Sequence, residues 1–532
     1  TLIFIGYLKP DGVFQDYVSD EWRLNLDCID GLGALKNLSF VRPNGVPFIG
    51  KLSALDIIYN CLKRSGIALN INTSVNILYE GLTSGNNVDV LANAFISTSR
   101  FYKKDGKLAK EGTIMDCEEV LKSILDLFCA SITQRNGEWY IYKANEIFLN
   151  SRVLFRSYNL DNNFTGTKVL NLAQDLGSQI DNYYPHHTGA NQKISIEGSV
   201  SAFRIGYKYG YVNGFLNNSS FTHNINDYGT WQVIAPTQVI YDPTTDVGLR
   251  IKSRAPNQTP LLIATSENVP LISGNSFALN INITASNRSI NFNFKVRLGN
   301  YYLNSLGEWT LDNVFIEYFL DNGTFLGFNR GVTQSFIINS LPIPESGNVS
   351  VEIYSPVNEF NTSNSYGIIN TLDIVNTFAG DNVDGEFHTV QRASKVSTII
   401  KENKEVYNGD NLGIVYNGAI FKGNTNLITS VWNRVGYIGD YSLLRISAEE
   451  ELRIAQKPMR VFSGDVYGYI DYLSVVNINK FNSKFMPIEW TYDTKANITT
   501  VKLLELFAGE IVDIQYDYAV DYGETVQPTI NG

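Results

Sequence analysis

The middle of the chain carries the clearest pattern of hydrophobic and polar positions. Hydrophobic residues alternate with polar or small ones over residues 277–283, and the alternation resumes over residues 290–298. A period of two is typical of strands with one buried face. Short strands of this kind recur between turns over residues 213–376, where no helical period stands out. This pattern predicts an all-β sandwich or jelly roll.

The part before the sandwich mixes strand and helix patterns. Hydrophobic residues recur at helical spacing over residues 52–62, and Gly66 is a suitable stop. Asp116, with Glu119 three residues later, forms a capping box that predicts the start of a second helix. Residues 1–150 are therefore predicted to be α+β.

Further signals predict strands and one more helix. Asn136-Gly137 favours a type I′ hairpin turn, because both positions of that turn need positive φ. A helix is predicted within residues 443–456, ended by Pro458. Strands are predicted over residues 202–211, 459–462, 466–476, 487–491 and 498–506.

The chain is therefore predicted to be mainly β with α+β parts, a split hub-like scaffold interrupted by an all-β jelly roll. The predicted parts are an α+β domain over 1–150, a β-rich connecting part over 151–212, an inserted sandwich over 213–376, and a β-rich second half of the scaffold with one helix over 377–532.

Composition narrows the class of protein. The 532 residues are 44% hydrophobic and 18% charged, which is typical of a globular chain with more than one domain. The net charge of −11 argues against a nucleic-acid partner, because phosphate binding needs a basic surface. No apolar stretch is long enough to span a membrane, and no signal peptide is expected.

The four cysteines are predicted to be buried thiols. They lie far apart in sequence and form no CxxC pair, so neither a disulfide framework nor a zinc site is expected. This fits a chain made in a reducing cytoplasm.

Motifs that carry chemistry are absent from the sequence. His186 and His187 are adjacent, so in a strand they point to opposite faces and cannot easily share a metal. Residues 381–386 resemble a calcium loop but lack its later ligands, and a solvated turn is favoured. We predict no catalytic residue, metal or cofactor. A pair of catalytic carboxylates in the sandwich would not show in the sequence, because the separation that such a pair needs is spatial and sets no fixed spacing along the chain.

Aromatic residues are the remaining candidates for a site. Trp231 and Trp309 could stack on sugar rings, and the alternative is that both belong to the core or edge of the sandwich. Tyr207, Tyr209 and Tyr211 fall on one face of a predicted strand, where we expect packing at a domain or subunit interface.

Three stretches resemble a known class of proteins. Residues 19–36, beginning Ser-Asp-Glu-Trp-Arg-Leu, residues 138–142 and residues 464–506 resemble tail-tip or baseplate hub proteins of tailed phages, especially of Bacteroidota hosts. The middle part resembles a carbohydrate-binding jelly roll, with residues 217–221 followed by Trp231 near its start.

The resemblance implies a virion structural protein and no enzyme. Such a hub is a ring, commonly a homotrimer, that is made in the host cytoplasm, closes the distal end of the tail tube, and contacts distal-tail, tape-measure, tip or fibre proteins. An outward sandwich would serve host attachment through a surface polysaccharide. The alternatives are a stand-alone surface glycan-binding protein, a glycosidase with few motifs, or the hub of a contractile injection system.

Overall fold

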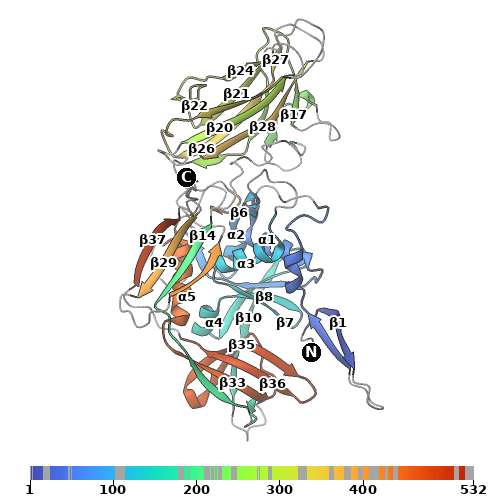
Figure 1. The fold of residues 1–532 in the computed structure, drawn as a ribbon, viewed down its shortest axis with the longest axis vertical. Helices are drawn as coiled ribbons and strands as arrows, with labels where there is room; N and C mark the ends of the chain where they lie inside the picture. Colours follow the sequence, from blue (N-terminus) through green and yellow to red (C-terminus); the bar gives the residue numbers. More distant parts are fainter. Residues whose placement is uncertain are drawn as a thin grey trace, which may run out of the picture.

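A computed structural model gives the fold of the chain. It describes residues 2, 4–15, 24–45, 48, 51–101, 114–177, 185–189, 191–208, 216, 221, 225, 231–240, 248–271, 273–274, 276–285, 290–320, 332–358, 365–376, 385–392, 400–406, 419–425, 429, 431–434, 441–507 and 514–521. The chain is mainly β with α+β parts, as predicted. Figure 1 shows a sandwich above a larger mixed body, which we call the scaffold.

The sandwich consists of two sheets. The nine-stranded sheet contains β15 (Trp231–Val233), β18 (Leu262–Ser266), β19 (Val269–Leu271), β21 (Ile290–Leu298), β22 (Tyr301–Leu303), β23 (Trp309–Thr310), β24 (Ile316–Leu320), β26 (Gly347–Tyr354) and β27 (Val357–Asn358). The five-stranded sheet contains β16 (Val239–Ile240), β17 (Leu249–Lys252), β20 (Phe277–Ala285), β25 (Val332–Asn339) and β28 (Tyr366–Asn376). Every pairing of these strands stays within residues 231–376.

The two strands with the clearest alternation lie in different sheets. β20 pairs with β25 and β28, whereas β21 pairs with β22, β24, β26 and β27. The hydrophobic residues of both strands are buried in one core between the sheets. The alternation therefore identifies the buried face of each strand correctly. β20 and β21 follow each other in sequence, but they lie in opposite sheets and do not pair with each other.

The scaffold contains all five α-helices of the described residues. These are α1 (Ala54–Arg64), α2 (Val90–Asn93), α3 (Cys117–Leu127), α4 (Ala144–Leu149) and α5 (Leu443–Ala455). Its strands before the sandwich are β1 (Tyr7–Gln15), β2 (Leu24–Ile29), β3 (Lys51–Ser53), β4 (Ile71–Ser74), β5 (Ile77–Tyr79), β6 (Ala94–Ser97), β7 (Ser131–Arg135), β8 (Glu138–Tyr142), β9 (Arg152–Tyr158), β10 (Phe164–Asn171), β11 (Ala173–Leu176), β12 (His186–His187), β13 (Lys193–Glu197) and β14 (Ala202–Lys208). Those after it are β29 (Gly385–Arg392), β30 (Ile400–Val406), β31 (Ile420–Lys422), β32 (Trp432–Arg434), β33 (Met459–Tyr467), β34 (Val475–Ile478), β35 (Ser483–Asp493), β36 (Ile498–Glu505) and β37 (Ile514–Asp521).

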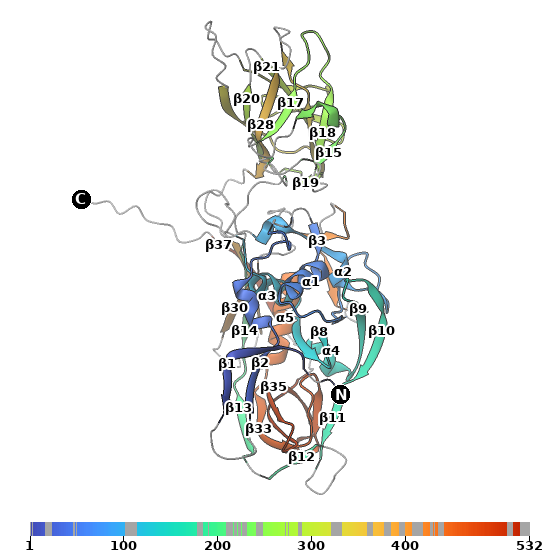
Figure 2. The same cartoon turned by 90° about the vertical axis from the view of Figure 1, so that its right-hand side faces the viewer.

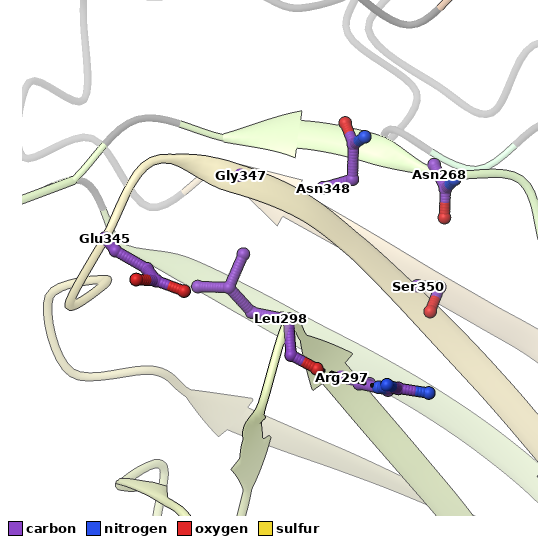
Figure 3. A pocket seen from close by; sticks show the side chains of 8 residues that line it. Asn268, Arg297, Leu298, Glu345, Gly347, Asn348 and Ser350 are labelled. Carbon is purple, nitrogen blue, oxygen red and sulfur yellow. Dashed lines mark hydrogen bonds between the residues drawn. The ribbon is translucent and has the colours of Figure 1, made fainter.

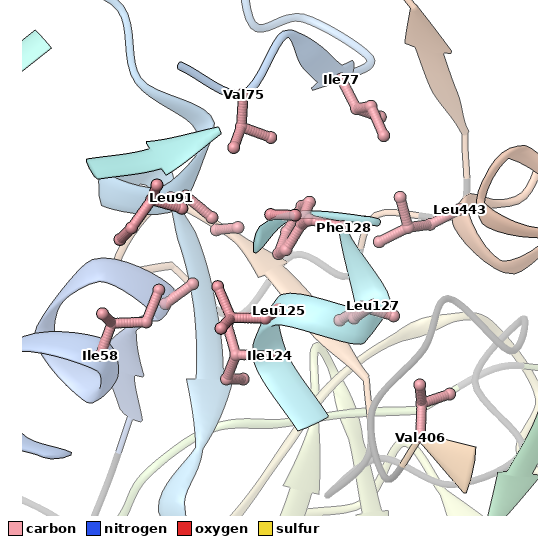
Figure 4. Packing of buried hydrophobic residues seen from close by; sticks show 14 of the residues in the cluster. Ile58, Val75, Ile77, Leu91, Ile124, Leu125, Leu127, Phe128, Val406 and Leu443 are labelled. Carbon is pink, nitrogen blue, oxygen red and sulfur yellow. The ribbon is translucent and has the colours of Figure 1, made fainter. Parts of the chain in front are cut away.

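Strands from both sides of the sandwich pair throughout the scaffold. β14 pairs with β29 and β30, β6 with β31, β5 with β32, β11 with β34, and β13 with β33. The main core likewise joins residues such as Ile58 and Phe128 to Val406 and Leu443 (Figure 4). The two halves therefore form one body, as Figure 2 also shows.

The sandwich lies between two strands that are direct neighbours. Lys208, the last residue of β14, pairs with Gly385, the first residue of antiparallel β29. Residues 209–384 thus leave and re-enter the scaffold at one place, where a hairpin turn would otherwise suffice. The domain boundaries of the sequence analysis stay predictions, but this pairing explains how the scaffold accommodates an insertion.

Local signals gave correct helix and turn assignments. Asp116 and Glu119 form the predicted capping box of α3. Asn136 and Gly137 have φ of 51° and 76°, as a type I′ turn requires. One strand, β33, runs through residues 459–467, where we predicted a break, because it pairs without interruption with β36.

The cysteines only partly follow the prediction. Cys61 and Cys117 are buried, whereas Cys129 is half-buried and Cys28 is exposed. Cys28 lies on β2, which among the described strands pairs with β1 alone. None of the described helices is long and apolar enough to span a membrane.

Candidate functional site

The outer face of the nine-stranded sheet holds the candidate site. On β21, Phe294 and Val296 point into the core, so Lys295 and Arg297 belong to the opposite face. On β26, the same alternation places Asn348, Ser350, Glu352 and Tyr354 on that face, where Glu352 pairs with Lys295 and Ser350 with Arg297. The sheet thus carries polar and aromatic residues on the face away from its core, where Lys295 is 8% exposed and Arg297 is exposed.

Lys295 organises one part of this face. Its Nζ donates a hydrogen bond to Asn313 Oδ1 at 2.6 Å and lies 4.1 Å from the centre of the Phe315 ring. The Tyr354 and Tyr302 rings are 5.1 and 5.9 Å away. Burial lowers the pKa of Lys295, and the Glu352 carboxylate partly offsets this effect. Lys295 therefore holds the segment before β24 against the sheet and clusters three aromatic rings around a cation.

Tyr354 is fixed by two further contacts. Its hydroxyl donates to Glu352 Oε2 at 2.7 Å, and its ring meets that of Phe315 edge to face at 4.8 Å. Burial and the hydrogen bond to Glu352 raise the pKa of Tyr354 well above its usual range. The ring is therefore neutral, half-buried and rigid, as a stacking surface needs to be.

A pocket of about 390 Å³ lies beside neighbouring positions of β21 and β26, because its lining includes Arg297 and Ser350, which stand two residues from Lys295 and Glu352. Its lining consists of Asn268, Arg297, Leu298, Gly299, Glu345, Gly347, Asn348 and Ser350. Figure 3 shows Glu345 at one end of the pocket, and Arg297, Ser350 and Asn268 towards the other. The Arg297 Nε donates to Gly299 O at 2.8 Å, which anchors the exposed guanidinium beside the pocket.

The lining suits a hydroxyl-rich ligand. Guanidinium and amide groups donate hydrogen bonds, whereas the Glu345 carboxylate accepts them. The described residues contain no cluster of three His, Cys, Asp or Glu side chains that could hold a metal. The pocket can therefore bind a polar ligand through these donors and the Glu345 carboxylate.

The two predicted tryptophans occupy structural positions. Trp231 is 3% exposed and packs against Phe221, with ring centres 5.3 Å apart. It cannot stack on a sugar, because its faces are covered by the core. Trp309 is half-buried: its Nε1 donates to Leu341 O at 3.3 Å, and its ring meets Phe277 edge to face at 6.0 Å. Burial therefore assigns Trp231 to the core, whereas glycan binding by the half-buried Trp309 stays a prediction.

Of the domain or subunit interface that we predicted for Tyr207, the structure excludes the subunit interface. Its side chain is fully buried in the scaffold core, where the Arg100 guanidinium lies 5.6 Å from the ring centre. The neighbouring helices and strands of the same chain cover it, so no subunit can reach it. Tyr209 and Tyr211 lie outside the described residues, as do residues 381–384 of the calcium-like turn.

Sequence reasoning missed the residues of the outer face, although a signal for them exists. Asn291, Asn293, Lys295 and Arg297 are the polar half of the best alternating strand. A polar row of this kind marks a face but does not say that aromatic rings and a pocket adjoin it. Tyr302, Phe315 and Tyr354 reach the cluster from other segments, which only the fold brings together.

Comparisons with known proteins are limited to distant structural likeness. No family model matches the chain, and no curated protein matches it. Among solved structures, a CBM4 carbohydrate-binding module is 15% identical, with 30% of this chain and 99% of the module covered and a TM-score of 0.21. The module TmCBM61, in complex with beta-1,4-galactotriose, is 10% identical over 31% of this chain and 99% of its own, with a TM-score of 0.17. The C-terminal CBM6 of a marine laminarinase from Zobellia galactanivorans is 12% identical over 28% and 94%, with a TM-score of 0.16. Values this low establish neither a family nor a ligand for this chain.

Proposed function

We propose that the outer face of the nine-stranded sheet binds a polysaccharide. The observation that carries this proposal is that Arg297, which lines the pocket, stands two residues from Lys295 on β21 and opposite Tyr302 on β22, so pocket and aromatic cluster occupy neighbouring positions of one sheet. A pyranose presents hydroxyl groups at its edge and an apolar surface on its face. The pocket supplies donors and an acceptor for the hydroxyls, and the half-buried rings supply the apolar contact.

Rigidity supports the same proposal. Lys295 and Glu352 hold their aromatic neighbours before any ligand arrives, and Gly299 O holds Arg297. A site whose side chains are already ordered loses less conformational entropy on binding.

The test uses the full chain and a panel of bacterial surface polysaccharides. Arg297→Ala is expected to weaken binding at least tenfold in titration calorimetry, because it removes the charged donor of the pocket. Lys252→Ala removes an exposed cation from the five-stranded sheet and is the matched control, with unchanged affinity expected. Equal binding by both variants would place the site elsewhere. If the unaltered chain binds none of the polysaccharides, the proposed function is wrong.

For the whole chain, we propose a structural role in a phage tail tip, with the scaffold as hub and the sandwich as its attachment module. The three stretches of sequence resemblance support this role, and all of them lie in the scaffold. The insertion point between β14 and β29 is compatible with this role, because these two strands pair directly and their sheet needs no strand from the sandwich.

Purified virions separate this role from that of a stand-alone glycan-binding protein. We expect mass spectrometry to find the chain in tails and cryo-electron microscopy to place it at the tail tip. Absence from tails that retain infectivity would exclude the hub, while leaving polysaccharide binding to be decided by the Arg297 variant.

A further inference from the structure

Arg297 carries the positive charge of the sandwich pocket. The other lining residues are two amides, a hydroxyl, a leucine, two glycines and the Glu345 carboxylate. The Arg297 side chain is exposed, and its Nε donates to Gly299 O at 2.8 Å. This bond fixes one side of the guanidinium. The Nη1 and Nη2 groups form the other side, and they can donate together to a ligand.

The charge of Arg297 is not used within the chain. Among the residues that the structure describes, no carboxylate forms an ion pair with Arg297, and Ser350 is its neighbour on β26. Lys295, two residues earlier, differs in this respect. It is 8% exposed, donates to Asn313 Oδ1, and stands opposite Glu352. Arg297 is therefore the cation of this face whose charge is left for a ligand.

Glu345 gives the pocket an opposite end. Figure 3 shows its carboxylate on one side of Leu298 and the Arg297 side chain on the other. A carboxylate repels negative charge but accepts hydrogen bonds from hydroxyl groups. A ligand that spans the pocket therefore gains most with a negative charge at Arg297 and hydroxyl groups at Glu345.

We propose that the pocket recognises a uronic acid unit of the polysaccharide, with the sugar carboxylate bound by Arg297. The planar fork of a guanidinium matches the two oxygens of a carboxylate, and such charge-assisted pairs are stronger than neutral hydrogen bonds. The inference rests on the proposed function, because it names the class of sugar that the same site binds.

The charges around the pocket also limit how acidic the polysaccharide is. Glu345 leaves room for one negative group at the Arg297 end, and the net charge of −11 repels dense polyanions. We therefore expect a polymer in which uronic acid units are separated by neutral sugars.

Reduction of the carboxyl groups tests the inference. Hyaluronan, heparosan and gellan carry glucuronate units separated by neutral sugars. Carbodiimide activation followed by borohydride converts these units to glucose and leaves the linkages unchanged. In titration calorimetry, we expect the full chain to bind at least one native polymer. The reduced form of that polymer is expected to bind at least tenfold more weakly, because a hydrogen bond to a charged group is lost.

Arg297→Gln shows whether Arg297 reads the carboxylate. The change keeps an amide donor and removes the charge, and the exposed position makes it harmless to folding. We expect this variant to bind native and reduced polymers with equal affinity. Lys252→Ala removes an exposed cation from the five-stranded sheet and should keep the tenfold preference.

The outcomes separate the inference from the proposed function. Equal affinity of the unaltered chain for native and reduced forms overturns the inference, while polysaccharide binding stands. Binding confined to neutral polysaccharides has the same meaning. An Arg297→Gln variant that keeps the preference also overturns it, because another group then reads the carboxylate. If the chain binds neither these polymers nor any other polysaccharide, the proposed function fails and the inference with it.

Discussion

The sandwich and the scaffold bury their hydrophobic residues in contrasting ways. The sandwich core comes almost wholly from residues 216–374, with Ala419 and Phe421 added from the scaffold. The main scaffold core joins residues before position 208 to residues after position 389. A segment that forms its own core can be inserted into another fold, provided that its ends meet. The pairing of Lys208 with Gly385 meets that condition.

Buried charge separates the two regions further. In the scaffold, the Glu450 carboxylate forms ion pairs with the Lys143 ammonium at 3.3 Å and with the Arg434 guanidinium at 2.5 Å. The Asn145 Nδ2 adds a hydrogen bond to Glu450 at 2.9 Å. On the outer sandwich face, Lys295 is buried beside aromatic rings, whereas Arg297 is exposed. Buried ion pairs therefore connect the two halves of the scaffold, whereas the sandwich holds Lys295 against aromatic rings and leaves Arg297 exposed beside the pocket.

Phe421→Ala should have the largest effect on stability and should separate the unfolding of the sandwich from that of the scaffold. Phe421 lies on scaffold strand β31 but is fully buried with the sandwich core, and the Lys51 ammonium lies 4.5 Å from its ring centre. Removing a buried Phe costs about 3–5 kcal/mol. We expect calorimetry to show the sandwich melting earlier and separately from the scaffold. A shift of both transitions by the same amount would mean that the two regions unfold as one unit.

Glu450→Ala should affect the scaffold alone. The change leaves Lys143 as a buried charge without its main partner, which costs about 3–5 kcal/mol. Guanidinium denaturation is expected to show this loss in the scaffold transition only. Glu489→Ala is the control, because its ion pair with Lys502 at 2.8 Å is exposed and such pairs contribute at most about 1 kcal/mol. Equal effects of both changes would contradict a special role for burial.

Acid should weaken the ion pairs of Glu450 that connect the two halves of the scaffold. Burial alone would raise the pKa of Glu450, but Lys143 and Arg434 outweigh it and lower the pKa to about 2. The folded pKa lies below the unfolded value, so this contribution is complete above about pH 4.3 and is lost as the pH falls towards 2. We expect a loss of about 3 kcal/mol across that window. Glu450→Gln should remove this dependence; if it does not, other carboxylates control acid unfolding.

Asp116→Ala should have the smallest effect on stability, and it tests whether the local capping box determines where α3 begins. The change removes the capping box at the start of α3 and is expected to destabilise the scaffold by about 1 kcal/mol. Thermal unfolding followed by circular dichroism measures the loss. Asp116→Asn keeps an acceptor for the Glu119 N–H and should restore most of it. A neutral Asp116→Ala would show that packing alone determines where α3 begins.

Local chemistry explains the features that were predictable. The helix after Asp116, the Asn136-Gly137 turn and the buried side chains of β20 and β21 each depend on residues close together in sequence. Trp231 failed as a site residue because aromatic side chains suit a core as well as a binding face. A subunit contact of Tyr207 is excluded by its burial, and strand alternation could not have shown this because it does not say which face another part of the chain will cover.

The sequence by itself determined the mainly β character, the helix starts, the turns and the two faces of the strongest strands, because these follow from the spacing of neighbouring residues. Only the tertiary structure decided which strands pair. It placed β20 and β21 in opposite sheets, joined β14 to β29 across 176 residues of intervening chain, numbered 209–384, and gathered Tyr302, Phe315 and Tyr354 around Lys295. Such contacts depend on long-range packing, for which nearby residues carry no signal. The outer face of the nine-stranded sheet is therefore visible in sequence as a polar row and in the fold as a candidate binding site.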